Sequence, residues 1–323
     1  MSPVLVTGGS GYVGMQLVAS LLRGGRPVRA TVRSAAREAD LRAAVARSDA
    51  DDSGLEVVVA ELTDDGGWAT AVAGCEEIHH VASPIPLAQP DDPDELVVPA
   101  REGTLRVLRA ARDAGARRVV LTSSFAAVGY TPKPGGEYSE TDWTDPDMPG
   151  LPPYPRSKTI AERTAWAFIE REGGNTELVV VNPTFILGPT LSTQLVSSLR
   201  LIEMMLDGKM PVVPRQRFGL ADVRDVADLH ILAMASPEAR GKRFLALADG
   251  PTISYLKVAQ ILRERLGPLA ERVPTEEAPG DELPPLIIHN ERARQELGFR
   301  PRPVETTIVE TAENLRDLGL LER

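Results

Sequence analysis

A tyrosine and a lysine stand four residues apart in the segment YPRSK, residues 154–158. Prolines at positions 152 and 153 disfavour a helix before Tyr154, whereas Pro155 suits a first helical turn. A helix that begins here places Tyr154 and Lys158 on one face. A phenol with a pKa of about 10 is a weak acid–base group at neutral pH, but a nearby ammonium stabilises the phenolate and moves the pKa toward the working range. The pair predicts a proton-transfer site, with an ordinary surface helix as the alternative.

Hydroxyl side chains gather at the end of an expected strand, residues 118–123. Thr122, Ser123 and Ser124 fall at its carboxyl end, where a hydroxyl can hydrogen-bond a carbonyl oxygen as charge develops on it. A polar strand terminus without chemistry is the alternative. Tyr154 and Lys158 lie between this strand and the next expected one, residues 178–181, and this order favours a common site.

A glycine cluster follows the first apolar run, residues 4–6, and a helical pattern follows the cluster at once. The glycines fit two forms of the dinucleotide fingerprint, Gly9-x-Gly11-x-x-Gly14 and Gly8-x-x-Gly11-x-x-Gly14. Glycines let the backbone approach a pyrophosphate, and the helix N-terminus supplies N–H groups and partial positive charge. A purely structural turn is the alternative. The residues expected to bind the cofactor here are Gly8, Gly11, Tyr12, Val13 and Gly14.

The second expected strand, residues 28–32, is followed by an arginine, Arg33, with Arg37 one helical turn beyond. An acidic residue at this place holds the ribose 2′-hydroxyl of NAD, whereas an arginine accommodates the 2′-phosphate of NADP. A solvated surface arginine is the alternative. We therefore expect NADP, with NADPH preferred over NADH.

Three further strand ends contribute expected contacts with the cofactor, and one of them is Thr122, at the end of the strand 118–123. Glu61 and Leu62 close the third strand, where a carboxylate can accept from an adenine amino group, or can simply lie in water. The backbone after the fourth strand is expected beside the glycine turn, at Val81, Ala82 and Ser83.

His79 and His80 lie within the fourth expected strand. A histidine there is more often an interior residue than a catalyst, and no spacing of ligand residues indicates a metal. We expect no metal site.

Strands that alternate with helical patterns predict an α/β fold, a Rossmann-type doubly wound parallel sheet. The expected strands cover residues 4–6, 28–32, 55–60, 78–82, 118–123, 178–181 and 243–248. The expected later helices cover residues 35–47, 96–115, 195–206, 225–235, 255–266 and 304–318.

The regular alternation stops after residue 183, and the chain returns to the pattern only at about residues 225–248. We therefore expect an NADP-binding Rossmann domain from residues 1–183 and 225–248. A smaller, discontinuous C-terminal lobe from residues 184–224 and 249–323 would bind the substrate.

Composition narrows the function further. The chain has 323 residues, 42% of them hydrophobic, with no stretch as long as a membrane span. Its single cysteine, Cys75, and the direct entry into a strand without a signal-peptide pattern favour a cytoplasmic protein. The net charge of −10 argues against a nucleic-acid or anionic-membrane partner.

With these features together, the chain resembles the extended short-chain dehydrogenase/reductase family, which also holds nucleotide-sugar epimerases and dehydratases. The resemblance runs from the glycine cluster to LGF at 297–299 and GLL at 319–321. HVASP at 80–84, TSS at 122–124, NPT at 182–184 and DVRDVA at 222–227 look like its dihydroflavonol-reductase and aldehyde-reductase branch. The resemblance implies reduction of a small-molecule carbonyl substrate by NADPH, and a possible homodimer. It also implies a catalytic trio of Ser124, Tyr154 and Lys158, with Pro183 and Thr184 at the nicotinamide.

The chain departs from the family pattern in three places. Many members carry a relay asparagine on the fourth helix, where this chain has PARE at 99–102. The dehydratases carry an acid near the catalytic hydroxyl, whereas Ser124 is followed by FAA, so dehydration is not expected. The signature of cinnamoyl-CoA reductases around the tyrosine is missing from GLPPYPRSK at 150–158.

Two alternatives remain beside a carbonyl reductase. A nucleotide-sugar epimerase would use the same trio to oxidise and re-reduce one substrate. A non-enzymatic NADP-binding regulatory protein would keep the glycine turn but would not need Tyr154 and Lys158, which argues against it.

Overall fold

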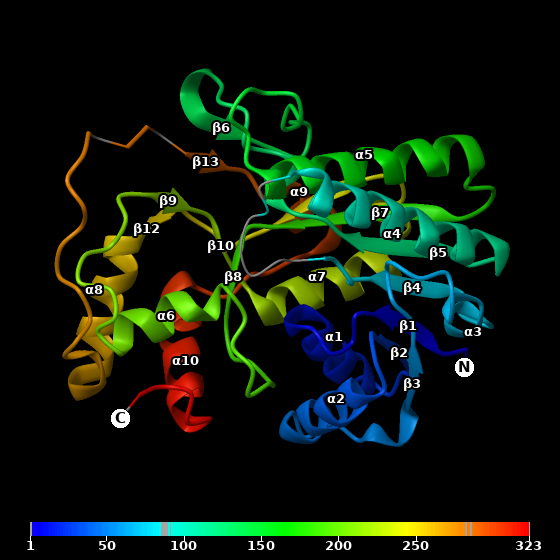
Figure 1. Ribbon diagram of the computed structural model, residues 1–323, viewed down its shortest axis with the longest axis horizontal. Coiled ribbons are helices and arrows are strands. Elements are labelled where there is room, and N and C mark those ends of the chain that lie inside the picture. Colours follow the sequence, from blue (N-terminus) through cyan, green and yellow to red (C-terminus); the bar gives the residue numbers. More distant parts are fainter. Residues whose placement is uncertain (1, 85–89, 91, 282, 285, 323) are drawn as a thin grey trace.

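The computed structural model describes residues 2–84, 90, 92–281, 283–284 and 286–322 (Figure 1). Within them, seven parallel strands form one sheet in the order β11-β7-β5-β4-β1-β2-β3. This order reverses direction beside β1, as in a doubly wound fold, and the predicted fold class is confirmed. The strands are β1 (Val4–Thr7), β2 (Val28–Val32), β3 (Leu55–Val59), β4 (Glu77–His80), β5 (Arg118–Thr122), β7 (Glu177–Pro183) and β11 (Arg243–Ala246).

Helices cover both faces of this sheet (Figure 1). Alternate residues of a strand point to opposite faces. Leu5 of β1 therefore packs with Leu108 and Phe168 on one face, and its neighbours Val4 and Val6 pack with α1 and α2 on the other. The first face carries α3 (Trp68–Val72), α4 (Asp94–Asp113) and α5 (Pro153–Glu172), and the second carries α1 (Tyr12–Arg23), α2 (Ala36–Arg47) and α7 (Val223–Ala235).

A second hydrophobic cluster builds the smaller lobe, at the left of Figure 1. Leu199 and Ile202 of α6 pack there with Leu262 of α8 and Ile308 of α10. The lobe elements are α6 (Leu199–Leu206), α8 (Tyr255–Leu266), α10 (Val304–Asp317), β8 (Phe185–Leu187), β9 (Arg217–Phe218), β10 (Leu220–Asp222) and β12 (Ile253–Ser254).

One part of the segment 249–323 packs with the sheet instead of with these lobe helices. Ala293 and Leu297 of α9 (Glu291–Leu297) share a cluster with Phe244 of β11. Strand β13 (Ile287–Ile288) pairs with β6 (Glu137–Tyr138), which lies in the loop before α5. The remaining short elements are the 3-10 turns Asp52–Gly54, Phe125–Ala127, Pro134–Gly136, Pro237–Ala239 and Gly267–Ala270. The helices of the described residues include none that is both long and apolar enough to cross a bilayer.

A buried arginine at the start of β5 holds the end of α7 against the sheet. Arg118 Nη1 donates to the carbonyl oxygens of Ala233, Met234 and Ser236 at 3.0, 2.9 and 2.6 Å. Its Nε and Nη2 donate to Glu177 Oε2 at 2.8 and 2.7 Å. These bonds satisfy carbonyl groups that a helix C-terminus leaves unpaired.

We expect Arg118→Met to lower the free energy of unfolding by about 3–5 kcal/mol, because Glu177 and the helix carbonyl oxygens lose the donors of Arg118. Urea denaturation followed by circular dichroism measures this. Arg117→Met is the control, since Arg117 is a half-exposed neighbour that pairs with Glu77. Equal losses for the two variants would contradict the role of Arg118.

Candidate active site

The glycine turn between β1 and α1 leaves no room for side chains. Gly8 has φ +68°, and a Cβ there would lie 2.8 Å from Ala82 Cα. A Cβ on Gly14 would lie 2.2 Å from Gly8 O, so only glycine fits. Among the described residues, no side chain caps α1, and its first N–H groups remain available to an anion. The turn therefore fits a dinucleotide pyrophosphate.

Thr7 joins this turn to the end of β4. Its Oγ1 accepts from the N–H groups of Val81 and Ala82, both at 3.1 Å, and lies 2.8 Å from His80 Nδ1. Burial lowers the pKa of His80 to about 3, so this ring is neutral and structural. The expectation of an interior histidine holds, and the backbone at 81–82 lies beside Gly8 as predicted.

Lys158 is buried at the carboxyl edge of the sheet. Its Nζ donates to Ser83 Oγ at 2.9 Å and lies 5.9 Å from the centre of the Tyr154 ring. Burial lowers the pKa of Lys158 to about 8, against the charge of Glu162, which raises it. Helix α5 starts at Pro153, so Tyr154 and Lys158 share its first turns, as the sequence predicts.

Tyr154 and Ser124 meet at the same edge. Burial raises the pKa of the Tyr154 phenol, and a hydrogen bond with the Ser124 side chain lowers it. Ser124 also accepts from the Ala126 N–H at 3.1 Å, which fixes its hydroxyl at the start of the 3-10 turn. The structure thus brings Ser124, Tyr154 and Lys158 together from two separate segments of the chain.

The two arginines expected at the 2′-phosphate differ in their surroundings. Arg37 pairs with Asp40 at 2.9 Å and donates to Gln194 Oε1 at 2.6 Å and to Ser10 O at 3.4 Å. Arg33 is exposed directly after β2, and within the described part of the chain it has neither a hydrogen bond nor an ion pair. Arg33 is therefore the arginine that is available to a phosphate.

The other predicted contacts are partly occupied by protein groups. Glu61 Oε1 accepts from the Leu62 N–H at 2.8 Å. Thr122 Oγ1 lies 2.8 Å from His230 Nε2 on α7, and the Tyr12 hydroxyl donates to Gly188 O at 2.6 Å. These side chains already make hydrogen bonds within the protein. Contacts of these residues with a cofactor would therefore come mainly from the backbone.

Pro183 ends β7, next to β5, and the Thr184 N–H donates to Ala246 O at 3.1 Å. Pro183 is therefore the last residue of the strand next to β5, and Thr184 is the first residue after it.

Sequence reasoning missed Asn182, which contacts the trio, and Glu162, which contacts Asn182. Asn182 Nδ2 donates to Ser124 O at 3.1 Å and to Glu162 Oε2 at 2.8 Å. Glu162 lies one helical turn after Lys158 and is fully buried. The available signals were the Asn182-Pro183 pair, read only as part of a resemblance, and the spacing of Glu162 from Lys158.

The relay asparagine that many family members carry has no counterpart on α4, as the sequence indicates. Pro99 lies inside this helix, and Arg101 pairs with Glu102 at 2.7 Å. The group that contacts Lys158 Nζ is instead the hydroxyl of Ser83. No group of three or more metal-ligating side chains occurs among the residues described.

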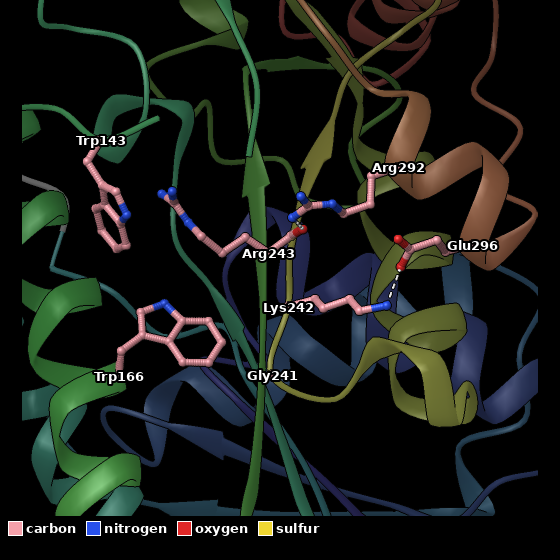
Figure 2. Close-up of a pocket in the computed structure, with 7 residues that line it drawn as sticks. All are labelled: Trp143, Trp166, Gly241, Lys242, Arg243, Arg292 and Glu296. Carbon is pink, nitrogen blue, oxygen red and sulfur yellow. Dashed lines mark hydrogen bonds and ion pairs between the residues drawn. The ribbon is translucent and has the colours of Figure 1, made fainter. Parts of the chain in front are cut away.

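A cavity of about 310 Å³ lies elsewhere, around the edge strand β11 (Figure 2). Trp143 and Trp166 stand on one side, and Arg292 and Glu296 of α9 on the other. Residues 241 and 242 place it at the amino end of β11. Because the trio and the glycine turn lie at carboxyl ends of strands, this cavity is not the predicted site.

The chain matches the NAD dependent epimerase/dehydratase family over residues 4–246. It is 35% identical to cinnamoyl-CoA reductase CAD2 of Medicago truncatula over 320 residues, which cover 97% of this chain and 95% of the relative. It is 32% identical to dihydroflavonol 4-reductase of Zea mays over 330 residues, 98% of this chain and 89% of the relative. Yeast methylglyoxal/isovaleraldehyde reductase Gre2, solved with NADPH, is similar at 26% identity with a TM-score of 0.85, covering 98% of this chain and 99% of that one.

These comparisons confirm the resemblance that the motifs predict. The family match covers well over half of the chain, and the relatives are similar along nearly all of it. The chain is therefore an oxidoreductase of the NAD dependent epimerase/dehydratase family, in the dihydroflavonol-reductase-like branch of the extended short-chain dehydrogenases/reductases.

Proposed function

We propose that this protein is an NADPH-dependent reductase of aldehydes or ketones, with Ser124, Tyr154 and Lys158 as its catalytic trio. The observation that carries the proposal is the meeting of these three side chains at the carboxyl edge of the sheet, beside the glycine turn. The relatives named above support it, since they are reductases and one was solved with NADPH.

The residues present fit the cofactor. The crowded glycine turn and the uncapped N-terminus of α1 would hold its pyrophosphate, and Arg33 would pair with the 2′-phosphate. Lys158 would bind the ribose, with Pro183 and Thr184 at the nicotinamide end. When bound, NADPH supplies the hydride for the carbonyl carbon.

The chain itself supplies the proton. Tyr154 donates its phenolic proton to the carbonyl oxygen, and Ser124 donates a hydrogen bond to the same oxygen. The Lys158 ammonium stabilises the phenolate that remains, since opposite charges at close range favour the ionised form. The Lys158 ammonium and the Tyr154 phenol are both shielded from water. The attraction between them is therefore stronger, because screening by water is reduced.

The substrate lobe, a cytoplasmic location and a homodimer stay predictions. The lobe follows directly from β7, because Pro183 leads into β8 and the Gly188 N–H then donates to Thr311 Oγ1 of α10 at 2.7 Å. We infer that this lobe, residues 184–224 with the lobe helices of 249–323, contacts the carbonyl substrate.

An epimerase would use the same trio without net consumption of cofactor. The exposed Arg33 favours NADP, which the cell keeps mostly reduced, and so it favours net reduction of a substrate. The absence of an acid after Ser124 also favours reduction. Net oxidation of NADPH in the presence of an aldehyde or ketone distinguishes the two reactions.

We expect Tyr154→Phe to lower kcat by about 10²- to 10⁴-fold, the usual value of general acid catalysis. The ring stays, so NADPH affinity, measured by fluorescence titration, should be unchanged. Tyr138→Phe is the control, because the Tyr138 hydroxyl donates to Thr131 O away from the trio. Near-normal turnover of Tyr154→Phe would contradict the assigned proton donor.

We expect Arg33→Ala to weaken NADPH binding by about 10- to 100-fold, because a charge-assisted hydrogen bond to phosphate is worth about 1.5–3 kcal/mol. NADH affinity should change little, since NADH lacks that phosphate. Arg42→Ala on α2 is the control, as Arg42 already pairs with Glu38 and Asp52. Equal losses for NADPH and NADH would identify Arg33 as an ordinary surface arginine.

A further inference from the structure

A carboxylate is buried directly behind the trio. Glu162, on α5, is 1% exposed, and five hydrogen-bond donor contacts surround its two oxygens. Burial of a carboxylate is energetically unfavourable unless the group is paired and hydrogen-bonded. These donors include an arginine and residues at the strand ends that carry the site, so the Glu162 carboxylate links the two.

An arginine neutralises Glu162 from the side away from the trio. Arg243 Nε donates to Glu162 Oε1 at 2.6 Å, and its Nη2 donates to Oε2 at 3.3 Å. Arg243 is itself fixed, because its Nη1 donates to Glu140 O at 3.0 Å and Asp142 O at 2.7 Å. Its guanidinium also lies 3.8 Å from the centre of the Trp143 ring. Figure 2 shows the Arg243 side chain extending toward Trp143. Arg243 is therefore the ion-pair partner of Glu162.

The second oxygen of Glu162 takes donors from the strand ends that carry the site. Oε2 accepts from Ser123 Oγ at 2.6 Å and from Asn182 Nδ2 at 2.8 Å. The same Asn182 amide group donates to Ser124 O at 3.1 Å. The carboxylate thus holds the Ser124 backbone in two ways. It binds the side chain of the preceding residue, Ser123, and it binds Asn182, which donates to the carbonyl oxygen of Ser124.

Glu162 also lies one turn from Lys158 on the same helix face. The titratable groups that face Lys158 are His80 from β4, Tyr154 and Glu162. The charge of Glu162 raises the pKa of Lys158 against the effect of burial.

Several charged groups of the neighbouring elements have partners of their own. On α4, which packs along α5, three of the four arginines pair with carboxylates: Arg101 with Glu102, Arg106 with Asp65, and Arg112 with Asp113. On β11, Arg243 lies on the other side of Glu162.

Another buried ion pair of the fold provides a contrast. Glu177 at the start of β7 pairs with Arg118 at 2.7 Å and Arg240 at 3.6 Å, at the opposite edge of the sheet. Among the described residues, its side-chain partners are these two arginines, and neither belongs to the trio. Glu162, by contrast, combines a buried ion pair with hydrogen bonds to the strand ends of the site.

We propose that Glu162 is a positioning residue, which fixes Ser124 through Ser123 and Asn182 and places a carboxylate one helical turn from Lys158. Its kinetic consequence rests on the proposed reductase function. The effect on Lys158 does not, so the two can be tested separately.

The first experiment is steady-state kinetics of Glu162→Gln. The amide keeps the shape, but it removes the negative charge and places an N–H₂ group against donors. We expect kcat to fall on the order of 10- to 100-fold through misplacement of Ser124 and Lys158, with KM for the carbonyl substrate nearly unchanged. Glu177→Gln is the matched control: it should lower the melting temperature and leave kcat unchanged.

The second experiment measures the charge on Lys158 without any substrate. The chain has only five lysines, so ¹³C-labelled lysine gives few side-chain signals, and Lys158→Met assigns the one required. We expect the Lys158 pKa to lie at about 8 in the wild type. In Glu162→Gln it should fall below the wild-type value, since an opposite charge is lost, and it should stay unchanged in Glu177→Gln.

Asn182→Ala gives a further variant that tests the link to Ser124. It should lower kcat on the order of 10-fold and leave the Lys158 pKa unchanged. If Glu162→Gln does not fold, normal turnover of Asn182→Ala overturns the proposal. A folded Glu162→Gln with wild-type kcat, or with an unchanged Lys158 pKa, overturns it as well. A wild type that reduces no carbonyl compound refutes the proposed function, and the lysine titration then decides the role of Glu162.

Discussion

The site depends on keeping the ammonium group of Lys158 buried. Transfer of a charge out of water is unfavourable, and this is why the pKa of Lys158 falls to about 8. A hydrogen bond with the Ser83 hydroxyl at 2.9 Å and the negative charge of Glu162, one turn along α5, act against that cost. Burial has a benefit in return, because the interaction of Lys158 with the Tyr154 phenol is little screened by water. A surface lysine at the same spacing would perturb the phenol much less.

The parallel sheet makes this arrangement possible. All seven strands of the described sheet run in one direction, so the segments that follow β1, β4, β5 and β7 emerge at one edge. The glycine turn, Ser83, Ser124 and Pro183 are therefore neighbours in space. Helix α5, which packs on one face of the sheet, must then begin at this edge. The bonds of Glu162 with Ser123, Asn182 and Arg243 hold the helix to three strands.

Local signals made the fold and the main elements of the site predictable. The alternation of apolar strands and helical patterns gave the sheet, and the Tyr154–Lys158 spacing gave a shared helix face that the structure confirms. Helix α9 was missed because seven residues with two buried apolar positions show almost no periodicity. The sequence also did not separate Arg33 from Arg37. Asp40 is a local i,i+3 partner of Arg37, but only the fold brings Gln194 to it.

The contacts of Glu162 could not be predicted for a similar reason. On a helix, a glutamate four residues after a lysine is an ordinary exposed pair, and nothing local indicates that it is buried. Its partners Ser123, Asn182 and Arg243 come from three strands that are far apart in the sequence. Family membership does not supply these contacts either. They follow from the position of α5 on the sheet.

The relatives include a cinnamoyl-CoA reductase at 35% identity, yet residues 150–158 of this chain lack the signature expected around its tyrosine. Similarity along the whole chain therefore supports the reaction more than the substrate. The reaction itself is tested most directly with NADPH that carries deuterium in the transferred position, and a panel of aldehydes and ketones. The account predicts one deuterium on the former carbonyl carbon of the alcohol for each NADPH consumed. Deuterium that returns to the cofactor without net NADPH oxidation, or no transfer to any carbonyl compound, would contradict it.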